Sequence, residues 1–196
     1  MKLLLLSDVE CKYFWDFYQP GRLDGLDLIL SCGDLDAHYL SFLVTMGTAP
    51  LLYVPGNHDV GYDRQPPEGC DCIDGKLVTV HGLRVLGLGG SMCYSGGAHQ
   101  YTERQMARRL MRLWPQLMRA GGVDVVLAHV PPRGIGDADD LPHRGFCCYH
   151  KLIETFRPRY FVHGHIHMNY GMDIPRTLRC GETTVINAYE RYLLDF

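Results

Sequence analysis

Short, continuous apolar runs recur along this chain and alternate with segments of helical periodicity. Runs of this kind are typical of strands that are buried on both faces of a sheet. They cover residues 2–6, 26–30, 51–54, 77–80, 84–88, 123–128 and 160–162, with further strand segments between 183 and 196. Strands that alternate with helices predict an α/β fold. The length of 196 residues fits one domain spanning 1–196.

Two segments carry helix signals. Asp36 is a candidate N-cap and Gly47 a candidate C-terminal stop, and apolar residues at helical spacing lie between them. Residues 102–120 predict the longest helix, with Thr102 as its cap and Pro115 as a point where it kinks or divides. We interpret three arginines of this segment as its solvent-exposed face: Arg104, Arg108 and Arg109.

Composition restricts the classes of partner. A net charge of −3 and a pI near 6.3 give no sign of a nucleic-acid-binding surface. The apolar run after Lys2 is only four residues long, too short for a signal peptide or a membrane span, so we expect a cytoplasmic protein. The eight cysteines form no CxxC pair, and we expect reduced thiols.

Polar residues follow four of the expected strands directly. They are Asp8, Asp34, the run Asn57-His58-Asp59, and His129. Singly, an aspartate at such a place is usually a turn residue and a histidine usually a hydrogen-bonded core group. As a set they indicate one site, because ligands bind beyond the carboxyl ends of strands in open α/β sheets.

A histidine-rich segment adds to this set. In an extended His163–His167 segment, His165 and His167 point the same way, and Gly164 permits the turn that brings them to the site. Carboxylate, amide and imidazole groups together suit divalent ions such as manganese, iron or zinc.

Five segments in this order resemble the motifs of calcineurin-like metallophosphoesterases. They are Asp8-Val9-Glu10, Gly33-Asp34, Gly56-Asn57-His58-Asp59, His129 and Gly164-His165-Ile166-His167. The resemblance covers residues 3–167. It implies a four-layer αββα sandwich, in which two mixed β-sheets pack face to face and helices flank them. It also implies a binuclear-metal phosphoester hydrolase.

The resemblance assigns a role to each matching residue. Asp34 would bridge two divalent ions. Asp8 and His167 would complete the first metal site, and Asn57, His129 and His165 the second. A hydroxide between the ions would be the nucleophile. His58, next to Asn57, would protonate the leaving alkoxide as a general acid. Asp59 either orients His58 or is a structural carboxylate of the loop.

Glu10 departs from the resemblance, because the first motif is usually Asp-x-His. A carboxylate can also bind a metal ion, so we expect Glu10 to ligate the first metal. We expect two divalent metal ions. Carboxylate ligands favour manganese over iron, zinc or nickel. The alternative is an unbound loop residue beside a weakly held metal.

The substrate is less constrained. The motifs lack the arginine after the bridging aspartate and the Gly-Asn-His-Glu sequence of Ser/Thr protein phosphatases, which favours a phosphodiesterase acting on a small molecule. Arg133, in the long aperiodic segment 131–147, is a candidate phosphate contact or an ordinary surface arginine. Tyr94 and His99 lie in the Gly- and Ser-rich loop Gly89–Tyr101, which either walls the site or is an ordinary turn.

Two other classes of function compete with the enzyme. A non-catalytic interaction scaffold of the same fold would be expected to lose His58 or several ligands, which are present here. A nucleotide-sensing module would need a phosphate-binding loop, and the sequence Gly87-Leu88-Gly89-Gly90 is not followed by a Walker lysine.

Overall fold

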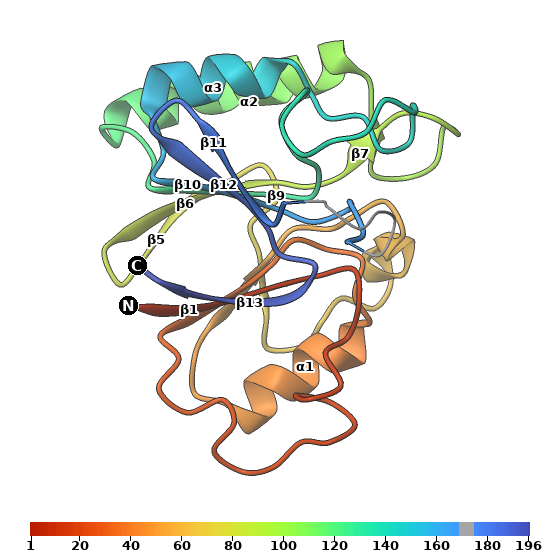
Figure 1. Cartoon of the computed structure of the whole chain (residues 1–196), viewed down its shortest axis with the longest axis vertical. Coiled ribbons are helices and arrows are strands. Elements are labelled where there is room, and N and C mark those ends of the chain that lie inside the picture. The colour runs from red at the N-terminus through yellow and green to blue at the C-terminus, as the bar shows by residue number, and fades with distance from the viewer. Residues whose placement is uncertain (169–174) are drawn as a thin grey trace.

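The computed structural model describes residues 1–168 and 175–196. Two mixed sheets lie face to face, and helices cover the outer face of each, as Figure 1 shows. The order of layers is α2 and α3, the larger sheet, the smaller sheet, and α1. The four-layer sandwich is therefore confirmed.

The smaller sheet has five strands in the order β13-β1-β2-β3-β4. Its strands are β13 (Glu190–Asp195), β1 (Lys2–Ser7), β2 (Leu28–Ser31), β3 (Leu51–Tyr53) and β4 (Asp71–Cys72). From β1 to β4 all neighbours are parallel, whereas β13 pairs antiparallel with β1. This pairing brings the two ends of the described chain together, where the N-terminal amine of Met1 donates to the carbonyl of Phe196 at 3.1 Å.

The larger sheet has six strands in the order β11-β12-β10-β9-β6-β5. Its strands are β11 (Thr177–Cys180), β12 (Thr183–Asn187), β10 (Tyr160–His163), β9 (Val125–Ala128), β6 (Leu83–Leu88) and β5 (Leu77–Val80). The four central strands are parallel, and the two edge strands are antiparallel to their neighbours. The expected hairpin between β5 and β6 is confirmed. A small parallel pair, β7 (Ser91–Met92) with β8 (Gln100–Tyr101), stands apart from both sheets.

The expected helix signals are confirmed at both helices. Asp36 caps α1 (Ala37–Met46) by accepting a hydrogen bond from the N–H of His38 at 2.7 Å. Thr102 caps α2 (Glu103–Arg119) in a capping box with Gln105, and α2 continues through Pro115 without ending.

A third helix, α3 (Cys148–Phe156), has no side-chain cap of its own and ends at Arg157 in the left-handed region. Its cap comes from α2 instead, because the carboxylate of Glu103 accepts hydrogen bonds from the N–H groups of Cys147 and Cys148 at 3.0 and 2.7 Å. A short 3₁₀ turn, η1 (Asp59–Asp63), follows β3.

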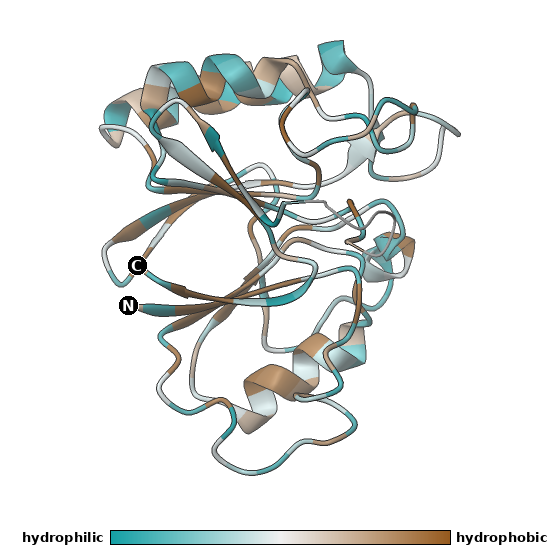
Figure 2. Cartoon of the chain, viewed as in Figure 1, coloured by the Kyte–Doolittle hydropathy of each residue, from teal (hydrophilic) through white to brown (hydrophobic). Residues whose placement is uncertain are grey.

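Three apolar clusters fill the spaces between the layers. One lies between the sheets and includes Leu5, Leu30, Val85 and Val125, all fully buried. A second lies under α2 and α3, and a third under α1. Figure 2 shows the brown, apolar strands in the interior. Burial on both faces explains the continuous apolar runs in the sequence.

The interpretation of Arg109 as a solvent-exposed residue is wrong. Its guanidinium bonds to the Asp74 carboxylate at 2.5 Å and to the carbonyl of Gly89 at 3.0 Å, and it lies over the ring of Tyr101. Only 17% of its side chain is exposed. Arg104 and Arg108 are exposed, as expected. Helical periodicity did not reveal that a carboxylate from a distant segment of the chain lies beside Arg109.

The eight cysteines, which all lie within the described residues, are free thiols. Within residues 1–168 and 175–196, no helix has the length and apolar character needed to cross a membrane.

Candidate metal centre

The polar residues that end the strands adopt unusual backbone conformations. Asp8 after β1, Asp34 after β2 and His165 after β10 have φ values of 67°, 56° and 66°. Side chains other than glycine rarely occupy this left-handed region, and such strain concentrates at functional sites. These three residues turn off the carboxyl ends of strands from both sheets toward a common point.

Glycines in the motifs allow the loops to approach closely. A Cβ atom on Gly56 would lie 2.0 Å from a carboxylate oxygen of Asp34, and one on Gly164 would lie 1.7 Å from the hydroxyl of Ser7. A Cβ on Gly33 would lie 2.3 Å from the backbone nitrogen of Gly56. Any side chain at these positions would push the candidate ligands apart.

His129 lies at the centre of the cluster and is fully buried. Its Nδ1 lies 2.7 Å from the carbonyl oxygen of Cys32. Its Nε2 lies 3.0 Å from Oδ1 of Asn57 and 3.4 Å from Oδ2 of Asp34. Three ligand-type atoms from three different loops therefore converge on one position.

The charges at this position explain the convergence. Burial alone would lower the pKa of His129, but the neighbouring Asp34 carboxylate outweighs it and raises that pKa to about 9. Burial would likewise raise the pKa of Asp34, but the His129 imidazolium holds it well below its usual range. Carboxylate, amide and imidazole groups thus surround one position beside Nε2 of His129, and these donors fit a divalent ion.

His165 joins the same group. Its ring centre lies 4.8 Å from that of His129, and its Nε2 lies 2.8 Å from the carbonyl oxygen of Pro142. Burial lowers its pKa to about 4, so the ring is neutral at pH 7. When the Nε2–H of His165 donates to the carbonyl of Pro142, Nδ1 has a lone pair for a metal ion. Metal-binding imidazoles commonly donate their other ring N–H in this way. Asp34, His129 and His165 each offer a ligand atom within 4.8 Å of one another.

Asp8 and His167 form a second pair beside this group. The buried carboxylate of Asp8 accepts hydrogen bonds from the backbone N–H of His165 at 2.8 and 3.0 Å. Nε2 of His167 lies 3.7 Å from the Asp8 carboxylate. The expected ligands other than Glu10 therefore lie near one another, with Asp8 and His167 beside the group around His129. Their division into two metal sites remains a prediction.

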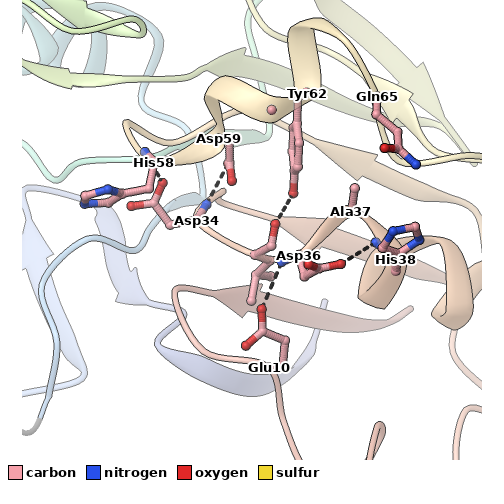
Figure 3. A pocket seen from close by; sticks show the side chains of 11 residues that line it. Glu10, Asp34, Asp36, Ala37, His38, His58, Asp59, Tyr62 and Gln65 are labelled. Carbon is pink, nitrogen blue, oxygen red and sulfur yellow. Dashed lines mark hydrogen bonds between the residues drawn. The ribbon is translucent and has the colours of Figure 1, made fainter.

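His58 stands at the edge of the site. Its backbone N–H donates to Oδ1 of Asp34 at 2.8 Å, and its imidazole is exposed. Asp59 bonds to the backbone N–H groups of Asp34 and Gly56 and is buried. Burial, followed by the charge of Asp34, raises the pKa of Asp59 to about 6. These contacts favour the structural role of Asp59 over an orienting role toward the His58 ring (Figure 3).

Glu10 lies in a pocket of about 420 Å³ beside the ligands. Its Oε1 accepts a hydrogen bond from the backbone N–H of Asp36 at 2.9 Å, which Figure 3 shows. Asp34 and His58 line the same pocket. Ligation by Glu10 remains a prediction, because its carboxylate is at the pocket and outside the tight group around His129.

Arg133 is held within its own loop. Its guanidinium bonds to the carboxylates of Asp137 at 2.7 Å and Asp139 at 3.1 Å, and to the carbonyl of Ala138. The same loop supplies Pro142 to His165, so residues 131–147 do contact the site as their length suggested. Phosphate contact by Arg133 remains a prediction.

Several supporting residues were not foreseen as partners of the ligands. The carbonyls of Cys32 and Pro142 orient the two buried imidazoles, and no side-chain pattern reveals a backbone acceptor. Asn187 fixes the last motif by donating to the carbonyl of Ile166 at 2.7 Å. Tyr94 was expected at the wall of the site, but its contact with a ligand was not: its phenol accepts a hydrogen bond from Nδ2 of Asn57 at 3.2 Å.

A family model described as calcineurin-like phosphoesterase matches residues 1–169. Metallophosphoesterase domain-containing protein 1 of Homo sapiens is 25% identical over 202 residues, covering 83% of this chain and 59% of that protein. A UPF0046 protein of Caenorhabditis elegans is 26% identical over 188 residues, covering 81% of this chain and 63% of its own length. The chain thus spans less than two thirds of either relative.

Solved structures agree with the fold. The crystal structure of TT1561 of Thermus thermophilus has a TM-score of 0.64 and 18% identity, covering 96% of this chain and 89% of that chain. Another crystal structure reaches a TM-score of 0.67 at 16% identity, covering 96% of this chain and 90% of that chain. At these identities the likeness establishes the architecture alone.

Proposed function

We propose that this chain hydrolyses a small-molecule phosphodiester with the help of two divalent metal ions. The chain belongs to the calcineurin-like phosphoesterase family, whose model matches residues 1–169. Family membership by itself implies metal-dependent phosphoester hydrolysis. The diester substrate and the number of ions are the additional steps that we propose.

One observation carries the proposal, namely the convergence of Oδ1 of Asn57 and Oδ2 of Asp34 on Nε2 of His129. His165 would complete this site, and Asp8 with His167 would hold a second ion. Bound ions of this kind supply positive charge that acidifies an attacking water and neutralises the phosphoryl oxygens.

The residues of the chain have separate tasks in this reaction. Asp34 would present its carboxylate to both ligand groups, and the N–H of His58 holds one of its oxygens in position. The exposed imidazole of His58 lies at the open edge of the site, where it would give a proton to the leaving oxygen.

The sequence around Asp34 and Asn57 supports a diester over a protein phosphomonoester. Leu35 and Asp36 follow Asp34 where protein phosphatases carry an arginine, and the Asp36 carboxylate is already occupied as the cap of α1. A dianionic monoester needs more positive charge than a monoanionic diester. We therefore propose that the site accepts the singly charged phosphate.

Hydrolysis of bis(p-nitrophenyl) phosphate and of p-nitrophenyl phosphate, measured together with metal content by elemental analysis, tests this function. We expect two metal ions per chain and faster hydrolysis of the diester. Faster hydrolysis of the monoester would contradict the substrate class. Hydrolysis of neither ester by metal-loaded protein would favour the interaction scaffold.

Glu10 would bias the choice of metal. The proposal gives the first site two carboxylates, Asp8 and Glu10, besides the bridging Asp34. Carboxylates suit manganese, whereas imidazole suits zinc, nickel and iron. We expect manganese to restore the highest activity in wild type and to lose this advantage in Glu10→Ala. An unchanged order of metals in Glu10→Ala would show that Glu10 is not a ligand.

A further inference from the structure

We propose that Tyr94 is a phosphate-binding residue whose phenol donates a hydrogen bond to a phosphoryl oxygen of the substrate. The inference rests on the proposed function and names one further group of that site. It starts from a contact between a rim residue and a candidate metal ligand, the 3.2 Å hydrogen bond between Nδ2 of Asn57 and the oxygen of Tyr94.

The two partners lie at different depths. Asn57 is 6% exposed, whereas Tyr94 is 37% exposed. The phenol therefore extends from the solvent-facing rim to the buried ligand. Only the side chain of Asn57 separates the Tyr94 oxygen from Nε2 of His129, because Asn57 contacts the first through Nδ2 and the second through Oδ1.

The hydrogen-bond inventory leaves one proton unused. A phenol has one O–H donor besides its acceptor lone pairs. The Tyr94 oxygen accepts a hydrogen bond from Asn57, and within residues 1–168 and 175–196 its O–H donates to no protein acceptor. Asn57 in turn presents its Oδ1 to the metal position and its Nδ2 to Tyr94. The contact fixes the phenol oxygen beside the site while its proton stays available to a ligand.

The loop that carries Tyr94 is attached firmly to the site. The side-chain oxygen of Gln100 accepts hydrogen bonds from the N–H groups of Tyr94 at 3.2 Å and Ser95 at 3.0 Å. At the base of the loop, the N–H of Gly90 donates to the carbonyl of Pro55 at 2.8 Å, two residues before Asn57. The loop that carries Tyr94 is thus hydrogen-bonded to the segment that carries Asn57.

The buried pair of Arg109 and Asp74 supports this base. Arg109 donates a hydrogen bond to the carbonyl of Gly89, and Asp74 accepts one from the backbone N–H of Gly89 at 2.6 Å. Gly90 must be a glycine, because its φ is 84° and a Cβ would lie 2.3 Å from the carbonyl oxygen of His99. These contacts preorganise the loop, so the phenol need not be ordered when a substrate binds.

A neutral donor suits this position. Hydrogen bonds to charged groups are worth about 1.5–3 kcal/mol, which corresponds to roughly 10- to 150-fold in binding or rate. Tyr94 would also add no charge that competes with the metal ions. Since the charge on the phosphoryl oxygens persists through the reaction, the bond should help both binding and catalysis.

The test uses Tyr94→Phe, which keeps the ring and removes only the hydroxyl. Two quantities are measured on metal-loaded protein: kcat/KM for bis(p-nitrophenyl) phosphate, and the Kd of inorganic phosphate by calorimetry. We expect each to worsen by about 10- to 100-fold at saturating metal. Tyr101→Phe is the matched control, since that phenol lies on β8 nearby and its ring contacts Arg109; it should leave both quantities unchanged.

The outcomes separate this inference from the proposed function. If Tyr94→Phe weakens only metal binding, and phosphate affinity at saturating metal equals that of wild type, Tyr94 merely positions Asn57 and the inference is overturned. Unchanged phosphate affinity and unchanged kcat/KM overturn it as well. If wild type hydrolyses neither ester, the proposed function fails, whereas the loss of phosphate affinity in Tyr94→Phe can still be observed.

Discussion

The carboxylate of Asp59 accepts a hydrogen bond from the backbone N–H of Asp34 at 2.7 Å, through the same oxygen that accepts one from Gly56 at 2.8 Å. One buried oxygen therefore joins the loop after β2 to the loop after β3. The N–H that this bond holds belongs to a residue in the left-handed region, since Asp34 has a φ of 56°.

Asp59→Asn should weaken metal binding, because a neutral amide oxygen would accept the two backbone N–H bonds less strongly than the charged carboxylate oxygen does. Losses of supporting contacts around a metal typically cost about 10- to 100-fold in affinity, and we expect that range for calorimetric titration with manganese. Asp63→Asn, an exposed substitution in the same turn, is the control. Wild-type affinity in Asp59→Asn would show that the two loops hold their places without it.

Metal binding should release a proton from His129. With its pKa raised to about 9, the imidazole is protonated at about pH 7.5 in the metal-free protein, whereas a ligand must be unprotonated. Affinity should therefore rise with pH up to about 9. Calorimetry in buffers of different ionisation enthalpy should detect about one proton released from this group at about pH 7.5. A pH-independent affinity between about pH 6 and 9 would contradict the proposed ligand role of His129.

His58→Ala should slow esters with poor leaving groups by about 10²- to 10⁴-fold, because these leaving groups need a proton. Esters of activated phenols should be affected much less. Rates measured across a series of phenyl esters of increasing leaving-group pKa would reveal the difference as a steeper slope. Equal losses across the series would mean that His58 only positions phosphate.

Arg109→Ala should destabilise the fold by about 3–5 kcal/mol, because it leaves the mostly buried Asp74 carboxylate without its partner. Urea unfolding monitored by circular dichroism measures this change in the free energy of unfolding. Arg108→Ala, one position earlier on the exposed side of α2, should change it by less than about 0.5 kcal/mol. Similar stability of the two variants would refute a structural role for the pair.

Much of the fold was predictable because its signals are local. The apolar runs of β1 and β2 reflect burial on both faces, and the caps of α1 and α2 are neighbours in sequence. Helix α3 was not predictable in this way, since its cap is Glu103, which lies 44 residues before Cys147. The two-residue strands β4, β7 and β8 are too short to leave a periodic pattern.

The candidate site likewise has a part that was predictable from local sequence and a part that was not. Its candidate ligands are side chains at strand ends, so ordered motifs predicted which residues meet around His129. The groups that orient them are not visible in such motifs: the carbonyl of Cys32, the carbonyl of Pro142 and the amide of Asn187 act through tertiary contacts. The buried position of Arg109 depends on Asp74, which is 35 residues away in sequence.

The central claim is that Asp34 is shared by two metal ions, and Asp34→Ala tests it most directly. Metal content by elemental analysis and hydrolysis of bis(p-nitrophenyl) phosphate are measured on the same preparation, with circular dichroism to confirm folding. Without the shared carboxylate, two cations would repel each other, so we predict at most one ion per chain and loss of hydrolysis to background. Two bound ions with near wild-type hydrolysis in Asp34→Ala would contradict the account.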